Sequence, residues 1–187
     1  TDARRRIWES RSKGTRLLSQ TLAALPSPPS VLVSASASGI YGDRGDETLT
    51  EASSLGDGFL ADVCRAWEAA TAPAEAAGIR VVHARIGLVA TPAGGFLQKL
   101  LLPTLLGLGG WPGDGSAYWP WIALDDAVYA LHHALLTEGL RGPVTRAQVD
   151  GFAAGIEAHA KLRHPGIVKV LDVRRGPDLL AVTMEHV

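Results

Sequence analysis

The most chemically suggestive stretch of the sequence is VLVSASASGIYGD, in which an apolar run ends in small residues and one tyrosine. Alanine, serine and glycine at positions 35–39 leave room for a flat ligand to approach the backbone, whereas a leucine would fill that space. The hydroxyl groups of Ser36 and Ser38 could orient a carbonyl or an amide by hydrogen bonding. A serine-rich loop without a ligand is the alternative interpretation, and the stretch alone favours neither.

Strands and helices that alternate along the chain must position this stretch. The apolar pattern predicts strands at residues 31–33 and 80–86 and helices at residues 7–25, 59–77 and 121–136. Pro73 marks a kink or a break in the second helix, and Gly87 indicates close approach of a ligand or of another backbone. The alternation predicts an α/β fold with a parallel sheet, in which ligands bind beyond the carboxyl ends of the strands.

The composition excludes several classes of protein. A net charge of -1 and a single short basic run at residues 4–6 argue against a nucleic-acid binder. The apolar run FLQKLLLPTLLGLGG contains a lysine and a proline and is too short to span a membrane. The only cysteine, Cys64, cannot form an internal disulfide, which indicates an intracellular protein, and no cluster of ligands predicts a metal site. We interpret His83, His132 and His133 as structural.

Several segments together resemble one known family. SASASGIYGD is followed in order by ETLTE, GDGFLADVCRAWEAA, GIRVVHARIGLVA and GLGGWPGDGSAYWPWIALDD. These segments are similar to the atypical extended short-chain dehydrogenases/reductases of the epimerase family, relatives of the nucleotide-sugar epimerases. The resemblance covers residues 2–144. It implies a Rossmann-type domain that binds NADP or NAD, with a small-molecule substrate held by the C-terminal loops.

The resemblance also implies roles for single residues. Catalytic roles fall to Ser36 and Tyr41. The pocket for the nicotinamide would be lined by Ala35, Ser36, Ala37, Arg85, Ile86, Gly87 and Leu88, and the substrate side by Arg11, Gly110, Trp111 and Trp121. For Arg11, a surface arginine that pairs with Glu9 or Asp2 is the alternative.

The proton-transfer pair of this superfamily has no counterpart in the chain. Its reductases and epimerases use a Tyr-x-x-x-Lys pair, in which the lysine lowers the tyrosine pKa so that the phenol can pass a proton while hydride moves. An alignment anchored on Glu68 places Leu60 and Cys64 at these positions, and a shift by one residue places Phe59 and Val63 there. None of these side chains replaces the pair, and Cys64 on an apolar stripe is expected to be a buried hydrophobe.

The glycine-rich turn that holds the pyrophosphate is the second missing feature. The family carries this turn in its first βαβ unit, and GLGGWPGDG neither follows a strand nor opens a helix in the required way. Because the chain starts inside a predicted helix, we expect its natural beginning to be missing. The chain alone is therefore expected to bind a dinucleotide weakly.

The C-terminal segment differs in pattern from the rest of the chain. A predicted helix at residues 151–162 precedes two strands joined by a short polar turn. AHAKLRHPGIVKVLDVRRGPDLLAVTMEHV resembles the N-lobe of protein kinases, most closely the Scy-like pseudokinases, with Met184 at the gatekeeper position. The glycine-rich loop, the lysine and the catalytic segments of a kinase are not found, and Gly155 stands where the helix glutamate would be. Kinase activity is therefore excluded for this chain.

The sequence predicts two domains and leaves two hypotheses about function. Residues 1–144 are expected to form an incomplete NAD(P)-binding Rossmann-like domain, and residues 145–187 a small α+β fragment like a kinase N-lobe. The first hypothesis is an epimerase- or reductase-family protein of weak or no activity, in a natural fusion, a truncated chain or an imperfect gene model. The alternative is a non-catalytic adaptor of the pseudokinase type, which binds a protein partner through its C-terminal fragment.

Overall fold

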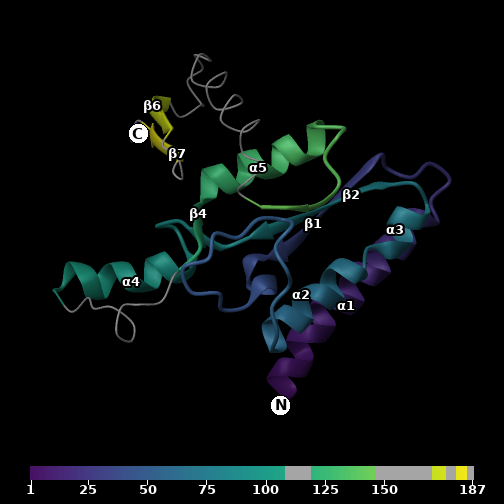
Figure 1. Ribbon diagram of the computed structural model, residues 1–187, viewed down its shortest axis with the longest axis horizontal. Helices are drawn as coiled ribbons and strands as arrows, with labels where there is room; N and C mark the ends of the chain where they lie inside the picture. Colours follow the sequence, from purple (N-terminus) through teal and green to yellow (C-terminus); the bar gives the residue numbers. More distant parts are fainter. Residues whose placement is uncertain (108–118, 146–169, 176–179, 185–187) are drawn as a thin grey trace. The chain divides into compact units, whose positions relative to one another are not determined.

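The computed structural model describes residues 1–107, 119–145, 170–175 and 180–184 of the 187-residue chain. The chain divides into two compact units, Thr1–Thr145 and Arg146–Val187. The first unit is an α/β structure built on a parallel sheet, and it contains the candidate site (Figure 1).

Three parallel strands form the centre of the first unit. They are β1 (Val31–Ala37), β2 (Arg80–Ile86) and β5 (Gly142–Val144), in the order β1-β2-β5. The register pairs the first residues of β1 and β2 with each other and the last residues with each other, so the two strands end at the same level. Two shorter strands, β3 (Leu88–Ala90) and β4 (Trp121–Ala123), form a separate parallel pair that follows directly from β2.

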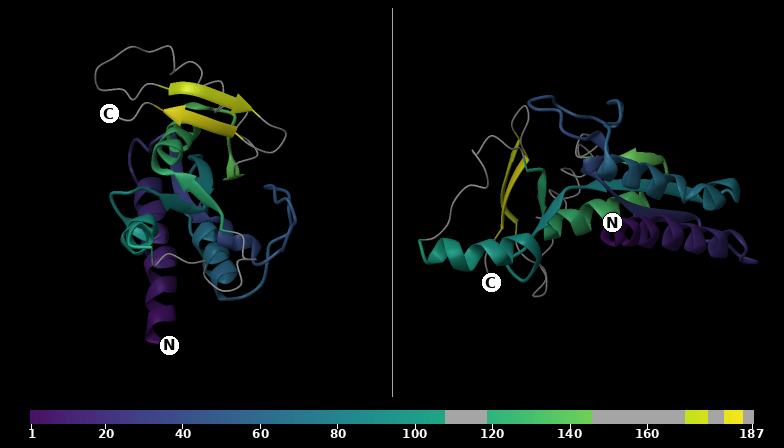
Figure 2. Two further views of the ribbon diagram at one scale, coloured as in Figure 1. Left: turned by 90° about the vertical axis from the view of Figure 1, so that its left-hand side faces the viewer. Right: turned by 90° about the horizontal axis from the view of Figure 1, so that it is seen from below.

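Helices cover the sheet from both faces. α1 (Asp2–Ala23), α2 (Phe59–Ala69) and α3 (Ala72–Ala76) lie together against one face, and α5 (Leu124–Leu136) lies against the other (Figures 1 and 2). α4 (Gly95–Leu105) follows β3, and the 3-10 turn η1 (Ser38–Tyr41) follows β1. The carboxyl end of β1 therefore leads into η1, beside the first turns of α2.

Two small clusters of buried residues fix the helices on the first face. One contains Ala74, Ile79 and Val81, with Leu22 and Leu32 packed against them, and the other contains Ile40, Tyr41 and Cys64, with Ala37 and Leu49 packed against them. The burial of Cys64 confirms the prediction from its apolar stripe.

On the other face, a buried arginine fastens α5 to the sheet. Arg80, the first residue of β2, donates from Nη1 to the carbonyl oxygens of Ala134 at 2.9 Å and Leu140 at 3.0 Å, and from Nη2 to that of Leu135 at 2.8 Å. The last carbonyl groups of a helix have no partner within the helix, so a charged donor at this place satisfies them.

Two predicted elements differ from the observed ones near the candidate site. The first strand continues to Ala37, beyond the predicted end at residue 33, because its alternating alanines and serines stay in the parallel ladder with β2. The helix predicted from residue 121 begins at Leu124, since residues 121–123 pair with β3 as strand β4.

The helix predicted at residues 59–77 is broken, as Pro73 indicated. The break separates α2 from α3 at residues 70 and 71, and Pro73 lies in the first turn of α3, where a missing amide hydrogen costs no helical hydrogen bond. The strand predicted at residues 80–86 is confirmed.

The second unit contains an antiparallel hairpin of β6 (Val170–Arg175) and β7 (Leu180–Met184). This agrees with the two strands that the sequence predicts there. The predicted helix at residues 151–162, including Gly155, lies outside the described residues. Within the part of the chain that the structure describes, no helix has the length and apolar character needed to cross a membrane.

Candidate functional site

The two faces of the β1–β2 pair carry different chemistry, because side chains alternate along a strand. Toward α2 point Ser34 and Ser36 of β1 and His83 and Arg85 of β2, which are all buried. Toward α5, apart from Arg80 at the start of β2, the same strands present small or apolar residues, among which Ala35 is exposed.

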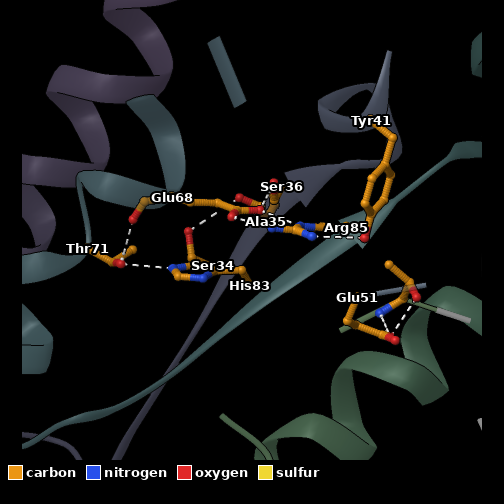
Figure 3. Close-up of polar contacts among 10 residues, drawn as sticks. Ser34, Ala35, Ser36, Tyr41, Glu51, Glu68, Thr71, His83 and Arg85 are labelled. Atoms are coloured by element: carbon orange, nitrogen blue, oxygen red, sulfur yellow. Dashed lines mark hydrogen bonds and ion pairs between the residues drawn. The ribbon is translucent and has the colours of Figure 1, made fainter. Parts of the chain in front are cut away.

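A buried ion pair between Glu68 of α2 and Arg85 of β2 is the centre of the polar face (Figure 3). Arg85 donates from Nε to Glu68 Oε1 at 2.8 Å and from Nη2 to Glu68 Oε2 at 2.9 Å, the two-pronged geometry typical of strong arginine–carboxylate pairs. Ser36 Oγ donates to Glu68 Oε1 at 2.6 Å, and Arg85 Nη1 donates to the Tyr41 hydroxyl oxygen at 2.8 Å. The pair therefore joins β1, β2, α2 and η1.

Both members of the pair are held in their charged forms. Burial alone would raise the pKa of Glu68, but hydrogen bonds from Arg85 and Ser36 outweigh burial, and the pKa lies below its ordinary value. The hydrogen bonds to Glu68 raise the pKa of Arg85 above its ordinary value, against the effect of burial. Neither group can exchange a proton near neutral pH, so the pair positions other groups and does not act as an acid or a base.

His83 lies on the same face and is bound within the fold. Thr71 Oγ1 donates to the carbonyl oxygen of Glu68 at 2.7 Å and lies 2.9 Å from His83 Nε2. Burial lowers the pKa of His83, so its imidazole is neutral at pH 7. These contacts fit the structural role that we assigned to this histidine from the sequence.

The structure divides the predicted pocket residues into two groups. Ser36 and Arg85 are buried, and their polar atoms already bind Glu68 or Tyr41. The others are exposed or partly buried at the ends of β1 and β2, namely Ala35, Ala37, Ile86, Gly87 and Leu88. Only the second group leaves surface that a ligand could contact.

The close approach indicated at Gly87 is made by the chain's own backbone. A Cβ atom at Gly87 would lie 2.5 Å from the carbonyl oxygen of Pro120, and the Leu88 amide donates to this oxygen at 2.8 Å. The glycine therefore allows the segment before β4 to pack against the end of β2.

Tyr41 lies beneath the surface. Its side chain is buried, with the residue 2 % exposed, and the Arg85 guanidinium carbon lies 5.2 Å from its ring centroid. Both the ring and the hydroxyl of Tyr41 are thus bound by the same arginine.

Leu60 and Cys64 occupy the positions that the alignment gives to the tyrosine and the lysine. Leu60 is 63 % exposed, and its Cβ lies 4.0 Å from the position of a Cβ on Gly39, the second residue of η1. Cys64 is buried, and burial raises the pKa of its thiol. A hydrocarbon side chain therefore lies close to the turn that follows β1.

Arg11 stacks over an aromatic ring of α2. Its guanidinium carbon lies 5.7 Å from the ring centroid of Trp67, and Nη1 donates to Ser10 Oγ at 2.8 Å. The alternative pairing with Glu9 or Asp2 is not observed, because these carboxylates bind Lys13 and Arg5 instead.

The other predicted substrate-side residues are placed only in part. Trp121 begins β4 and is 67 % exposed. Gly110 and Trp111 lie outside the described residues. Among the residues that the structure describes, no three histidine, cysteine or acidic side chains gather as metal ligands would.

Comparisons of the whole sequence and fold find similar known proteins. No family model matches the chain. Epimerase family protein Mb2239 of Mycobacterium bovis is 43 % identical over 138 residues, which are 74 % of this chain and 45 % of that protein. Epimerase family protein YfhF of Bacillus subtilis is 34 % identical over 139 residues, which are 74 % of this chain and 46 % of that protein. These matches support the resemblance of this chain to the epimerase family of extended short-chain dehydrogenases/reductases.

Solved structures of epimerases have the same fold. The nucleoside-diphosphate sugar epimerase from Corynebacterium glutamicum has a TM-score of 0.68 at 41 % identity, over 84 % of this chain and 36 % of its own. The human epimerase family protein SDR39U1 (isoform 2), solved with NADPH, has a TM-score of 0.71 at 29 % identity, over 83 % of this chain and 56 % of its own. The α/β architecture is Rossmann-like, and the chain spans about half the length of the curated relatives that it matches.

Sequence reasoning missed the role of Glu68 in this fold. The sequence analysis used Glu68 only to anchor an alignment, although the strand RVVHARI contains Arg80, His83 and Arg85 among apolar residues. Charged residues in a buried strand need buried partners. This signal predicts that an acidic residue from another element must lie against the strand.

A second missed residue is Gly56, in the loop between η1 and α2. A Cβ atom there would overlap the carbonyl oxygen of Tyr41, and the Gly56 amide donates to the Ile40 carbonyl at 3.0 Å. Arg65 of α2 donates to the Gly56 carbonyl oxygen at 2.6 Å. Gly56 therefore holds the loop against the buried tyrosine.

Proposed function

We propose that this chain is the part of an NAD(P)-binding epimerase-family protein that receives the nicotinamide end of NADP or NAD. The observation that carries the proposal is the pairing of a rigid, fully hydrogen-bonded polar layer with a strand end where Ala35 is exposed. The human relative solved with NADPH supports the choice of cofactor.

The proposed pocket residues act in two ways. Ala35, Ala37, Ile86, Gly87 and Leu88 would line the pocket, since small or apolar side chains leave room for a planar ring and exclude water. Ser36, Tyr41 and Arg85 would support the pocket from beneath through their bonds to one another and to Glu68. The roles of Ser36 and Tyr41 in catalysis would then be to position the strand end and η1.

The reaction type follows from the family and is an oxidoreductase or epimerase reaction on a small molecule. Arg11, Gly110, Trp111 and Trp121 would lie on the substrate side. Because hydrocarbon and thiol side chains, Leu60 and Cys64, stand in place of the Tyr-x-x-x-Lys pair, the chain would be weakly active or inactive by itself. The missing glycine-rich turn for the pyrophosphate would weaken binding further.

A second candidate function concerns the C-terminal unit. The antiparallel hairpin of β6 and β7 favours the kinase-N-lobe resemblance, in which two such strands precede the hinge. In this case the chain would be a non-catalytic adaptor of the pseudokinase type that binds a protein partner.

Titration with NADPH, followed by nicotinamide fluorescence, tests the cofactor proposal. We expect the fluorescence to rise on binding, and Ala35→Leu to weaken the binding roughly tenfold or more, because the larger side chain occupies the space of the ring. Ala3→Leu, at an exposed alanine of α1, is the matched control and should leave binding unchanged. Unaltered binding by Ala35→Leu would remove this strand end from the pocket, and no binding at saturating NADPH would favour the adaptor.

A further inference from the structure

The loop between η1 and α2 carries a set of hydrogen bonds within itself. Arg44 donates from Nε and Nη2 to the two carboxylate oxygens of Glu47, both at 2.8 Å. It also donates from Nη1 to the carbonyl oxygen of Ser54 at 3.0 Å. One guanidinium thus joins the two arms of the loop. These bonds make residues 43–55 a compact segment, which we call the strap.

Glycines with a left-handed backbone stand on both sides of the strap. Gly42 has a φ of 71° and Gly58 a φ of 98°, values that residues with a side chain rarely adopt. Between these glycines the loop closes on itself, because the Gly56 amide donates to the Ile40 carbonyl oxygen at 3.0 Å. Beyond this neck, residues 45–48 are all exposed. A loop with a closed neck and little buried surface can open as one unit while the elements beside it stay folded.

A carboxylate clip fastens the strap on the far side of β2. Glu51 Oε1 accepts from the Thr145 amide at 2.5 Å and from Thr145 Oγ1 at 2.6 Å (Figure 3). Thr145 follows β5, the strap follows η1 at the end of β1, and the order β1-β2-β5 places β2 between them. The strap therefore runs across the carboxyl end of β2.

The clip is charged at neutral pH. Burial alone would raise the pKa of Glu51, but the hydrogen bonds from Thr145 outweigh burial, and the pKa lies below its ordinary value. Hydrogen bonds to an ionised acceptor are stronger than those between neutral groups. The two bonds to Glu51 are therefore the strongest polar attachment that the structure gives the strap.

Leu49 attaches the strap to a buried cluster. This leucine is partly buried and packs against the cluster of Ile40, Tyr41 and Cys64. Cys64 is 5 % exposed and is the only cysteine of the chain. When the strap opens, Leu49 leaves the cluster and the thiol of Cys64 loses cover. The chain therefore contains its own reporter of strap opening.

We propose that the strap closes the carboxyl end of β2, that the Glu51–Thr145 clip holds it shut, and that its opening admits a ligand to the strand ends. Ligands of parallel sheets bind beyond these ends. The strap opens by release of the clip and of Leu49 together, with the neck as the hinge. The gating role rests on the proposed function, because the ligand that it admits is the nicotinamide end of NADP or NAD.

Two probes that lie far apart in the sequence test the strap without any cofactor. Hydrogen exchange of the Thr145 amide reports release of the clip, and labelling of Cys64 with DTNB reports loss of the Leu49 cover. We expect both probes to give the same opening equilibrium constant, with a much weaker dependence on urea than global unfolding has. Two different constants, or a dependence as steep as that of global unfolding, would overturn the proposal that the strap opens as a unit.

Variants of the clip show what holds the strap shut. Glu51→Ala removes both bonds to Thr145 and should raise both opening constants about tenfold or more. Glu47→Ala is the matched control, because its bond to Arg44 lies within the strap, and both constants should change by less than about twofold. If Glu51→Ala fails to fold, Thr145→Val serves instead, since it loses only the hydroxyl bond and should raise the constants several-fold. Unchanged constants in the clip variant would contradict the role of the clip.

Release of NADPH, followed by stopped-flow nicotinamide fluorescence, tests the gating role separately. The Glu51→Ala chain should release NADPH several-fold faster than the unsubstituted chain, whereas Glu47→Ala should release it at the unsubstituted rate. Equal rates in all three chains would refute the gating role. A chain that does not bind NADPH would contradict the proposed function and the gating of this ligand with it, while hydrogen exchange and thiol labelling still decide whether the strap opens.

Discussion

The two faces of the β1–β2 pair belong to the same short strands, yet one carries a buried polar network and the other carries small side chains that are partly uncovered. On the α2 face, Ser36, Glu68, Arg85 and Tyr41 form a closed network in which the charges are paired and buried. On the α5 face, small side chains such as Ala35 leave surface uncovered. The comparison shows that Ser36 binds the strand to α2, whereas Ala35, the residue before it, leaves surface open on the other face.

This division has a consequence for chemistry. A hydroxyl that donates to a buried carboxylate is not available to orient a ligand, whereas a methyl group on the open face can contact one without losing a hydrogen bond. The hydrogen bonds of the polar face make the site rigid, because they join the ends of β1 and β2 to α2. The predictions below test this difference, in order of decreasing effect.

Breaking the ion pair on the polar face should have the largest effect. Glu68→Leu leaves the Arg85 guanidinium buried without a counter-charge, and we expect the free energy of unfolding to fall by about 3–5 kcal/mol. Urea denaturation measures this change. The double variant Glu68→Leu/Arg85→Leu should recover part of the loss, since no unpaired charge remains.

The exposed pair Lys13–Glu9 on α1 provides the control for this experiment. Lys13 is 74 % exposed and bonds Glu9 at 2.9 Å, and its replacement by alanine should leave the urea midpoint unchanged. If Glu68→Leu were as harmless as Lys13→Ala, the polar face would not be the rigid layer that we describe.

Neighbouring residues of β1 should respond differently to changes of similar size. Ser36→Ala removes a donor from the buried carboxylate of Glu68, and we expect a loss of about 1–3 kcal/mol in the free energy of unfolding. Ala35→Ser, on the open face one residue earlier, should change it by less than about 0.5 kcal/mol. Equal effects in thermal or urea unfolding would contradict the assignment of the two residues to opposite faces.

Acid should weaken the polar face in two stages. Because burial lowers the pKa of His83, the unfolded chain takes up a proton below about pH 6.5 that the folded chain does not, so stability falls as the pH decreases. Glu68, whose pKa is also lowered in the folded chain, adds a further loss below about pH 4.3.

Substitution of the histidine separates the first stage from the second. His83→Gln removes the titrating ring and should abolish the fall in the urea midpoint between pH 7 and pH 5. His132→Gln, at an exposed histidine of α5, should retain that fall. A fall of equal size in both variants would assign the first stage to another group.

The alternation of elements was predictable, and the arrangement of side chains around Glu68 was not. The strand at 80–86 is visible in the sequence because its apolar residues are large, whereas the end of β1 is hidden because alanine and serine fit a loop as well as a strand. The start of α5 was misplaced for a related reason, since residues 121–123 become a strand only by pairing with β3.

The ion pair could not be predicted from spacing alone. Glu68 and Arg85 lie 17 residues apart on a helix and a strand, and only the packing of α2 on the sheet brings them together. The resemblance assigned Arg85 to the pocket without indicating its partner. Gly87 was singled out correctly as a place of close approach, but the sequence offered no means to choose between a ligand and Pro120.

The small side chain of Thr71 determines the chemical form of its neighbour. A threonine hydroxyl has one hydrogen, and here it goes to the Glu68 carbonyl oxygen, so the oxygen can only accept from His83. The imidazole must then hold its hydrogen on Nε2 and keep a bare lone pair on Nδ1. A single hydroxyl between helix and strand thus selects one of the two neutral tautomers, and in a nitrogen-15 spectrum the protonated ring signal of this residue should belong to Nε2 and the unprotonated one to Nδ1.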